Sequence, residues 1–347
     1  MIRIFLFFIG AAPLFSMEQW IVVTTIQYPT PALCKLAQIP GWQLVVVGDK
    51  KTPPDWHLDG CIYLSPERQL ALGYALSALL PWNHYCRKNI GYLYAIEQGA
   101  KVIYETDDDN EPLDDLRYIP CDRSLPLLFS QGDAFNIYAY FGSPEVWPRG
   151  FPFPLSHSSA WAIHGAEACR IGIEQGVVNG SPDVDAIFRL TQDRTVVFDP
   201  MPPCFLPPGL FCPINSQNTF FHKNVFFALY LPSTVTMRVA DIWRGYIAQK
   251  MLWSFGSVTA FSGPNAYQER NPHVLLHDFS MELDLYLKAP LLIDFLKQWD
   301  SEGKPLDRLA HLYRDLIEEN FFQKAEAPLI DAWIQDVRKV SPNEHDL

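Results

Sequence analysis

The sequence is poor in cationic residues: 27 Lys and Arg stand against 39 Asp and Glu, which gives a formal net charge of −12. Affinity for nucleic acid comes largely from clustered Lys and Arg, so we expect no nucleic-acid partner. Any anionic ligand must instead be bound by a few local cations.

Cysteine is also scarce, and the seven residues stand singly with no CxxC pair. This pattern fits neither a disulfide framework nor a zinc site, so we predict reduced thiols and a cytoplasmic protein. The nine histidines contain no HExxH pair. The absence of GxSxG and Walker-type glycine motifs leaves serine-hydrolase and P-loop functions without support.

The one long apolar run, residues 4–15, is too short for an ordinary membrane span. It follows Met1-Ile2-Arg3 and resembles the core of a signal peptide or a short anchor, through which the protein would associate with a membrane. Met17 stands just before an apolar strand, so residues 1–16 are alternatively a mis-assigned start. The sequence leaves both interpretations open.

What is present indicates a large α/β core, with 48% hydrophobic and 14% aromatic residues in 347. Apolar runs bounded by turn residues predict buried strands over 20–26, 43–49 and 100–106. Helical patterns separate these runs, which is typical of a parallel sheet with crossover helices.

The helical segments are predicted from periodicity and from their caps. Residues 30–39 should begin with Thr30 as N-cap and Pro31 at the first helical position, and residues 66–80 and 83–100 should follow, the last ended by Gly99. Residues 120–235 read as an elaborated loop-and-strand layer. A helix over 241–253 and a strand over 257–261 come next. We expect a catalytic domain over 17–279 and a helical extension over 280–347.

Three adjacent aspartates, Asp107, Asp108 and Asp109, come directly after the third predicted strand. Their mutual repulsion would be costly without a cation or dense hydrogen bonding. Carboxylate oxygens suit Mg²⁺ or Mn²⁺, which complete their coordination with substrate phosphate and water. Because ligands of open α/β sheets bind beyond the carboxyl ends of strands, we favour a metal and diphosphate site over a solvated acidic turn.

Residues near the same predicted edge are candidates for substrate binding. Arg87 and Lys88 begin the helix that leads into the acidic strand and could meet a diphosphate, although a solvated helical turn is the alternative. Asp49 follows a strand and a glycine, so it either accepts from a base or ribose or closes a turn. Thr25, at the end of the first strand, is assigned to the substrate with them.

Arg149 lies in a rigid apolar loop, where an unpaired cation is costly. A bound phosphate would resolve that cost, and so would a structural carboxylate. Asp241 is either a helix N-cap or a catalytic carboxylate that points at the substrate.

Two further pairs are open to both structural and functional interpretations. Asp183 and Asp185 fall in the first turn of a helix for which Ser181 would be the N-cap and Pro182 the first residue, although Asp185 is also a substrate-binding candidate. His273 and His277 stand at i,i+4, and one of them would complete the metal shell if it is not simply packed or exposed.

These motifs together resemble a known family. The strings VVTTI, GWQLVVVGDKKTP, PWNHYCRKNIGYLYAIEQGAKVIYETDDDN, VWPRGFP and PDVDAIFRLT, from about Trp20 to Pro272, are similar to the STELLO-type probable glycosyltransferases, or DUF288 family. The resemblance implies a GT-A-like nucleotide-sugar-binding fold, with a mixed, mostly parallel sheet flanked by helices, in which the acidic run binds metal and diphosphate. Beyond about Ser280 no likeness is visible.

A more distant resemblance is to the reversibly glycosylated polypeptides, the plant UDP-arabinopyranose mutases. Their Cys-Arg helix before an acidic run resembles Cys86-Arg87 and Asp107–Asp109, and their glycosylated arginine falls on Arg149. Of their aspartate pair only Asp241 remains. Phe261-Ser262 stands where they have Trp-His-Ser, so a histidine metal ligand is missing, and this departure puts mutase chemistry in doubt.

The resemblance implies glycosyl transfer from a UDP-sugar to an unknown glycan or protein acceptor. Asp107–Asp109 would hold Mn²⁺ or Mg²⁺, which stabilises the departing diphosphate with help from Arg87 and Arg149. Asp241 would contact sugar or acceptor, as a base if the reaction inverts. The alternatives are a mutase with Arg149 as transient carrier, and a non-catalytic scaffold that organises other glycosyltransferases through protein partners.

Overall fold

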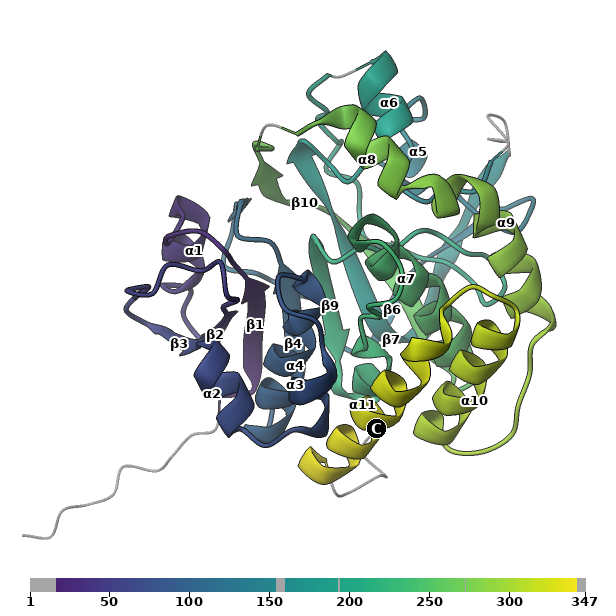
Figure 1. Ribbon diagram of the computed structural model, residues 1–347. Coiled ribbons are helices and arrows are strands. Elements are labelled where there is room, and N and C mark those ends of the chain that lie inside the picture. The colour runs from purple at the N-terminus through teal and green to yellow at the C-terminus, as the bar shows by residue number, and fades with distance from the viewer. Residues whose placement is uncertain (1–16, 154–159, 193, 272, 342–347) are drawn as a thin grey trace, which may run out of the picture.

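A sheet of ten strands runs through the centre of the computed structural model, which describes residues 17–153, 160–192, 194–271 and 273–341. The strand order is β3-β2-β1-β4-β9-β7-β6-β8-β10-β5. Helices pack against this sheet (Figure 1), so the α/β prediction is confirmed. The apolar leader predicted over residues 1–16 lies outside the described residues.

The first four strands form a parallel unit, and they confirm the three strands expected from the sequence. They are β1 (Gln19–Thr24), β2 (Trp42–Val47), β3 (Cys61–Leu64) and β4 (Val102–Thr106). β1, β2 and β4 are almost wholly buried, as expected for apolar runs covered on both faces. Their carboxyl ends therefore meet at one edge of the sheet.

Short helices connect these strands largely where their caps predicted them. α1 (Pro31–Leu36) begins with the Thr30 hydroxyl accepting from the Leu33 amide and with Pro31 in the first turn, as expected. The segment 66–80 forms two helices instead of one, α2 (Pro66–Ala71) and α3 (Ala75–Leu79), because Gly73 between them adopts a positive φ of 69°. A 3₁₀ turn, η1 (Tyr85–Arg87), leads into α4 (Lys88–Glu97).

The second half of the sheet is mixed. β9 (Asn218–His222) runs antiparallel between β4 and β7, so β7 and β10 point the same way as the first four strands. β7 (Trp161–Gly180) is long, and its exposed first half forms a ribbon with β6 (Asp122–Ser130). The short strands are β5 (Asn110–Pro112) and β8 (Cys204–Phe205), and β10 covers Val258–Gln268.

The remaining helices cover the sheet and its upper edge (Figure 1). They are α5 (Ile137–Tyr140), α6 (Ala186–Thr191), η2 (Lys223–Leu229), α7 (Met237–Trp253), α8 (Leu275–Met281), α9 (Leu283–Gln298), α10 (Pro305–Glu318), η3 (Lys324–Glu326) and α11 (Ala327–Val340). No helix in the described part of the chain is long and apolar enough to span a membrane.

The C-terminal helices contribute to the main core. Leu292 of α9, Leu312 of α10 and Trp333 of α11 are completely buried in the same cluster as Trp20 and Ile103 of the sheet. Asp336 of α11 also accepts hydrogen bonds from the first amides of α3, at 2.9 and 2.8 Å. The segment that we expected as a C-terminal extension therefore packs onto the sheet domain.

Candidate active site

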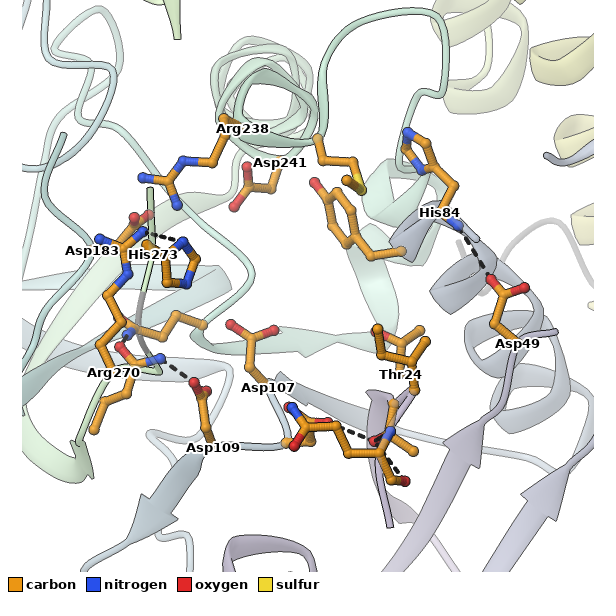
Figure 2. Close-up of a pocket in the computed structure, with 18 of the residues that line it drawn as sticks. Thr24, Asp49, His84, Asp107, Asp109, Asp183, Arg238, Asp241, Arg270 and His273 are labelled. Atoms are coloured by element: carbon orange, nitrogen blue, oxygen red, sulfur yellow. Dashed lines mark hydrogen bonds between the residues drawn. The ribbon is translucent and has the colours of Figure 1, made fainter. Parts of the chain in front are cut away.

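A cavity of about 400 Å³ opens where the carboxyl ends of the like-oriented strands meet. Its wall contains residues that follow β1, β2, β4, β7 and β10, together with the start of α7. This is the position at which open α/β sheets bind their ligands, and the volume is in the range of small-molecule sites. Figure 2 shows the Asp107 carboxylate in the middle, with Arg238, Arg270 and His273 on one side and His84 on the other.

The three aspartates after β4 are held apart by different partners. Asp107 Oδ1 lies 3.3 Å from the Lys88 amino group, and Asp108 Oδ2 accepts from the Thr25 hydroxyl at 2.5 Å. Asp109 accepts from Gln268 at 2.9 Å and from Asn271 at 3.3 Å. The predicted site residues Thr25 and Lys88 thus meet the acidic run, each by supporting a different carboxylate.

The electrostatics of the run suit a cation. The Asp107 side chain is 41% exposed. The surrounding protein still raises the pKa of Asp107 to about 7 by partial desolvation, opposed by Lys88 and reinforced by Asp109 and Asp108. Within the described residues, no three His, Cys, Asp or Glu side chains converge as a ready-made metal cluster. Mg²⁺ is commonly held by one or two carboxylates plus substrate oxygens, and the donor set here fits that mode.

Lys88 does not line the cavity, and Arg87 lines it as a buried side chain whose guanidinium is already bonded to the protein. The Arg87 guanidinium donates to Gln69 and to the carbonyls of Leu80 and Ser77, and it stacks over Trp82 at 3.5 Å. The fully buried Lys88 amino group also donates to the Thr106 carbonyl at 3.0 Å. Lys88 therefore acts on a ligand through Asp107, while Arg87 fixes the local chain.

Asp49 organises the loop that faces the acidic run. Its carboxylate accepts from the backbone amides of Lys50, Asn83 and His84, at 2.7, 2.8 and 3.2 Å. These bonds hold Asn83 in a left-handed conformation with φ of 56°, which an Asn tolerates better than most residues. Asp49 thereby closes a turn, and it fixes the position of the His84 side chain.

Arg149 is clamped between two carboxylates. Its guanidinium bonds to Asp183 at 2.7 and 2.8 Å and to Asp241 at 3.1 and 2.8 Å, and Nη1 also donates to the Arg238 carbonyl. All three side chains are at least 90% buried. The sequence left open whether Arg149 meets a bound phosphate or a structural carboxylate, and these contacts fit the structural carboxylate.

The clamp also sets the state of Asp241. Burial would raise the pKa of Asp241, but Arg149 and then Arg244 hold it below its ordinary value. Asp241 lies in the second turn of α7, whose N-cap is Thr236, so the helix starts four residues earlier than predicted and Asp241 is not its cap. Its carboxylate faces the cavity with its oxygens bonded to Arg149 and to Ser216.

Asp185 is a structural cap and does not line the cavity. It is the N-cap of α6, accepting from the Phe188 amide at 2.8 Å and from the Trp147 indole at 2.7 Å. The prediction that Ser181 and Pro182 begin this helix was wrong, because the chain bends at Ser181 and Asp183 and becomes helical only after Asp185. Burial raises the pKa of Asp185 to about 6.

Sequence reasoning missed two arginines that line the cavity, Arg238 and Arg270. Glu282, the residue after α8, accepts a hydrogen bond from Arg238 at 2.8 Å. Asp278 of α8 accepts one from Arg270 at 2.7 Å. Arg238 Nη1 and Arg270 Nε and Nη1 have no partner among the described residues. Burial and the neighbouring Arg238 lower the pKa of Arg270, so the two cations are close enough to repel each other.

The two candidate histidines are separated by the fold. His273 lines the cavity and contacts Arg270 at 3.0 Å, whereas His277 is exposed on α8 and does not line it. No local signal in the sequence marks Arg238 or Arg270, because their proximity depends on β10 and α7 meeting at the sheet edge. Figure 2 shows both pointing into the region beside His273 and Asp183.

Known proteins that resemble this chain include a family of glycosyltransferases. Residues 238–345 match the family described as STELLO glycosyltransferases. Probable glycosyltransferase STELLO1 of Arabidopsis thaliana is 36% identical over 93% of this chain, and STELLO2 of the same plant is 34% identical over 94%. The chain spans less than half of their lengths, 44% and 45%. The family match extends through the C-terminal helices, where inspection of the sequence had found no likeness.

Among solved structures, glucosyl-3-phosphoglycerate synthase from Mycobacterium tuberculosis, in complex with phosphoglyceric acid, aligns with a TM-score of 0.40. The alignment covers 82% of this chain and 81% of that one at 10% identity.

Proposed function

This chain is a relative of the STELLO glycosyltransferase family, and from that premise we propose that it transfers a sugar from a nucleotide sugar to an acceptor, assisted by a divalent metal. A UDP-sugar is the proposed donor. The observation that carries the proposal is the meeting, in one cavity at the strand ends, of the acidic run with two incompletely bonded arginines. A metal-bound diphosphate needs both kinds of group.

Asp107 and Asp109 would hold Mn²⁺ or Mg²⁺, and substrate oxygens and water would complete the coordination. Asp108 is committed to Thr25, and its backbone carbonyl accepts from Thr30, so it shapes the turn that presents its neighbours. When bound, the metal would neutralise the negative charge that develops on the departing diphosphate. Lys88, beneath the run, offsets part of the charge of Asp107.

Arg238 and Arg270 would bind the diphosphate beside the metal. Their buried carboxylate partners, Glu282 and Asp278, are absent from the cavity wall, so they orient the guanidinium groups from behind. A guanidinium fixed in this way loses little side-chain entropy when it binds phosphate. The charge-assisted hydrogen bonds would strengthen as the leaving group gains charge.

The Arg149 clamp favours a transferase over the mutase alternative. A carrier arginine must lose a proton and turn a nitrogen toward the sugar, but Asp183 and Asp241 outweigh burial and raise the pKa of Arg149 well above its ordinary value. Its nitrogens are already bonded to the two carboxylates. We infer that Arg149 positions Asp241 and Asp183 around the transferred sugar. The low pKa of Asp241 makes it a better hydrogen-bond acceptor than a general base.

The proposal is tested by calorimetric titration of residues 17–347 with nucleoside diphosphates and UDP-sugars, with and without Mn²⁺. We expect metal-dependent binding that Asp109→Asn weakens at least tenfold. Asp115→Asn, which removes the same charge from an exposed loop position six residues away, should change nothing. Absence of binding to every donor would refute the enzyme proposal and favour a scaffold that organises other glycosyltransferases.

Product analysis separates transferase from mutase. Incubation of the protein with UDP-sugar and Mn²⁺ but no acceptor should leave the sugar ring form unchanged. Ring-form exchange in the wild type that is lost in Arg149→Lys would overturn our assignment and support the carrier role.

A further inference from the structure

We propose that His84 reads the base of the nucleotide: its Nε2–H donates to a carbonyl oxygen of the base, so the site selects bases that carry one and discriminates against adenine. The inference rests on the proposed function, because it assumes that a nucleotide occupies the cavity. Neither the acidic run nor the arginines could provide this selection, since they meet only phosphate.

The tautomer of His84 follows from its hydrogen bonds. Nδ1 accepts from the backbone amide of Cys86 at 3.1 Å, so in the neutral ring the proton is on Nε2. Burial lowers the pKa of His84, which favours the neutral ring. Within the described part of the chain Nε2 has no partner, and it is not among the enclosed unpaired atoms, so it remains accessible as a donor.

The position of His84 is fixed before a ligand arrives. Asp49 accepts from the backbone amides of Asn83 and His84, and the imidazole stacks on Tyr85 with ring centroids 5.7 Å apart. A donor held in this way forms its hydrogen bond without the entropy loss of ordering a loop. Asp49 is therefore a positioning residue for base recognition, although its own carboxylate is occupied by backbone.

The cavity divides into an anion end and a base end around Asp107. Arg238, Arg270 and His273 lie on one side of this carboxylate, and His84 lies on the other, as Figure 2 shows. The cavity wall also contains Ile26, a 50% exposed aliphatic side chain just after β1 that offers an apolar contact. A nucleotide with its diphosphate at the arginines would extend its base toward His84.

A single N–H donor can distinguish the bases by whether they carry a carbonyl oxygen. Uracil, cytosine and guanine each carry a ring carbonyl, whereas adenine carries none. A site that hydrogen-bonds a substrate rejects analogues that leave its polar group unpaired. Loss of one such hydrogen bond costs about 1 kcal/mol, or roughly fivefold in affinity.

The experiment compares the dissociation constants of UDP, ADP and inorganic pyrophosphate, each with Mn²⁺, in wild type, His84→Phe and His84→Asn. Phe keeps the ring but removes both nitrogens, while Asn keeps a side-chain acceptor for the Cys86 amide and an N–H donor. We expect His84→Phe to weaken UDP about fivefold with pyrophosphate unchanged, so that the preference for UDP over ADP collapses. His84→Asn should retain at least half of that preference.

Several results would overturn the inference. An unchanged ratio of UDP to ADP affinity in His84→Phe would show that another group reads the base. Equal weakening of UDP and pyrophosphate would show that His84 acts only by holding the loop. If wild type bound pyrophosphate but no nucleotide better than pyrophosphate, base recognition would be refuted while the metal site stood. If wild type bound none of the three compounds, both base recognition and the proposed function would be refuted.

Discussion

Removal of the Arg149 side chain should reveal how far the clamp stabilises the fold. Arg149→Met keeps the aliphatic stem but removes four side-chain bonds, of 2.7 to 3.1 Å, to Asp183 and Asp241. Because both carboxylates are at least 90% buried, they would be left as uncompensated charges. Loss of one partner from a buried pair costs about 3 to 5 kcal/mol, so we expect a loss of about 4 kcal/mol at pH 8.

The pH dependence of that loss is the more specific part of the prediction. In the wild type, Arg149 keeps the pKa of Asp241 below its unfolded value, so the stabilisation is present above the unfolded pKa and is lost as pH falls through the folded pKa. Without Arg149, burial and Asp183 would raise the pKa of Asp241 instead. Protonation then relieves the repulsion, and the deficit of Arg149→Met should shrink between pH 8 and pH 5.5.

Urea unfolding followed by tryptophan fluorescence at the two pH values measures this effect. The control is Arg194→Met, which breaks a surface pair with Glu145 whose side chains are 45% and 52% exposed and is expected to cost about 0 to 1 kcal/mol. Arg149→Lys keeps the positive charge but loses the planar guanidinium, so its loss of stability should lie between those of Arg149→Met and Arg194→Met. A deficit for Arg149→Met no larger than that of the control, or one that grows at pH 5.5, would refute the buried-clamp argument.

Three further outcomes follow from the packing. Burial raises the pKa of Glu174 to about 7, so its ionisation should destabilise the fold as pH rises from about 4.5 to 7. In urea unfolding, Glu174→Gln should therefore be more stable than wild type by about 3 kcal/mol at pH 8 and equally stable at pH 4. Trp333→Ala should cost about 3 to 5 kcal/mol in the same assay, because this α11 side chain is completely buried; a loss below 1 kcal/mol would show that α11 is peripheral. Gly245→Ala should cost about 1 to 3 kcal/mol, because its Cβ would lie 2.4 Å from the Ile214 carbonyl oxygen, and an unchanged urea midpoint would contradict this clash.

The local parts of the fold could be predicted from the sequence. Strands β1, β2 and β4 are continuous apolar runs, and Thr30-Pro31 carries both signals of a helix start. Their position at one end of a parallel sheet follows from the β-α-β order, which placed the acidic run at the correct edge. Each strand and the helix start depend on residues that are close together in the sequence, and the edge position depends only on the order of the elements.

The cavity wall opposite the acidic run could not be predicted in the same way. Arg149 meets partners 34 and 92 positions away, and the sequence shows neither distance. The start of α7 was also missed, because Thr236 uses its hydroxyl on the Met281 carbonyl and forms no capping bond that a sequence pattern would indicate. Arg87 was predicted to meet a diphosphate, with a solvated helical turn as the alternative, because nothing local shows that carbonyls and Trp82 enclose it.

The two hydrogen bonds between Asp336 of α11 and the first amides of α3 join residues 261 and 260 positions apart. Trp333, one turn earlier, fills the core beside Tyr230 and donates to the Phe227 carbonyl at 3.1 Å. During translation, the parallel strands therefore leave the ribosome long before the helix that seals them. Until α11 emerges, the nascent chain exposes apolar surface that a chaperone would recognise, and a premature stop codon before Ala327 would leave that surface open permanently.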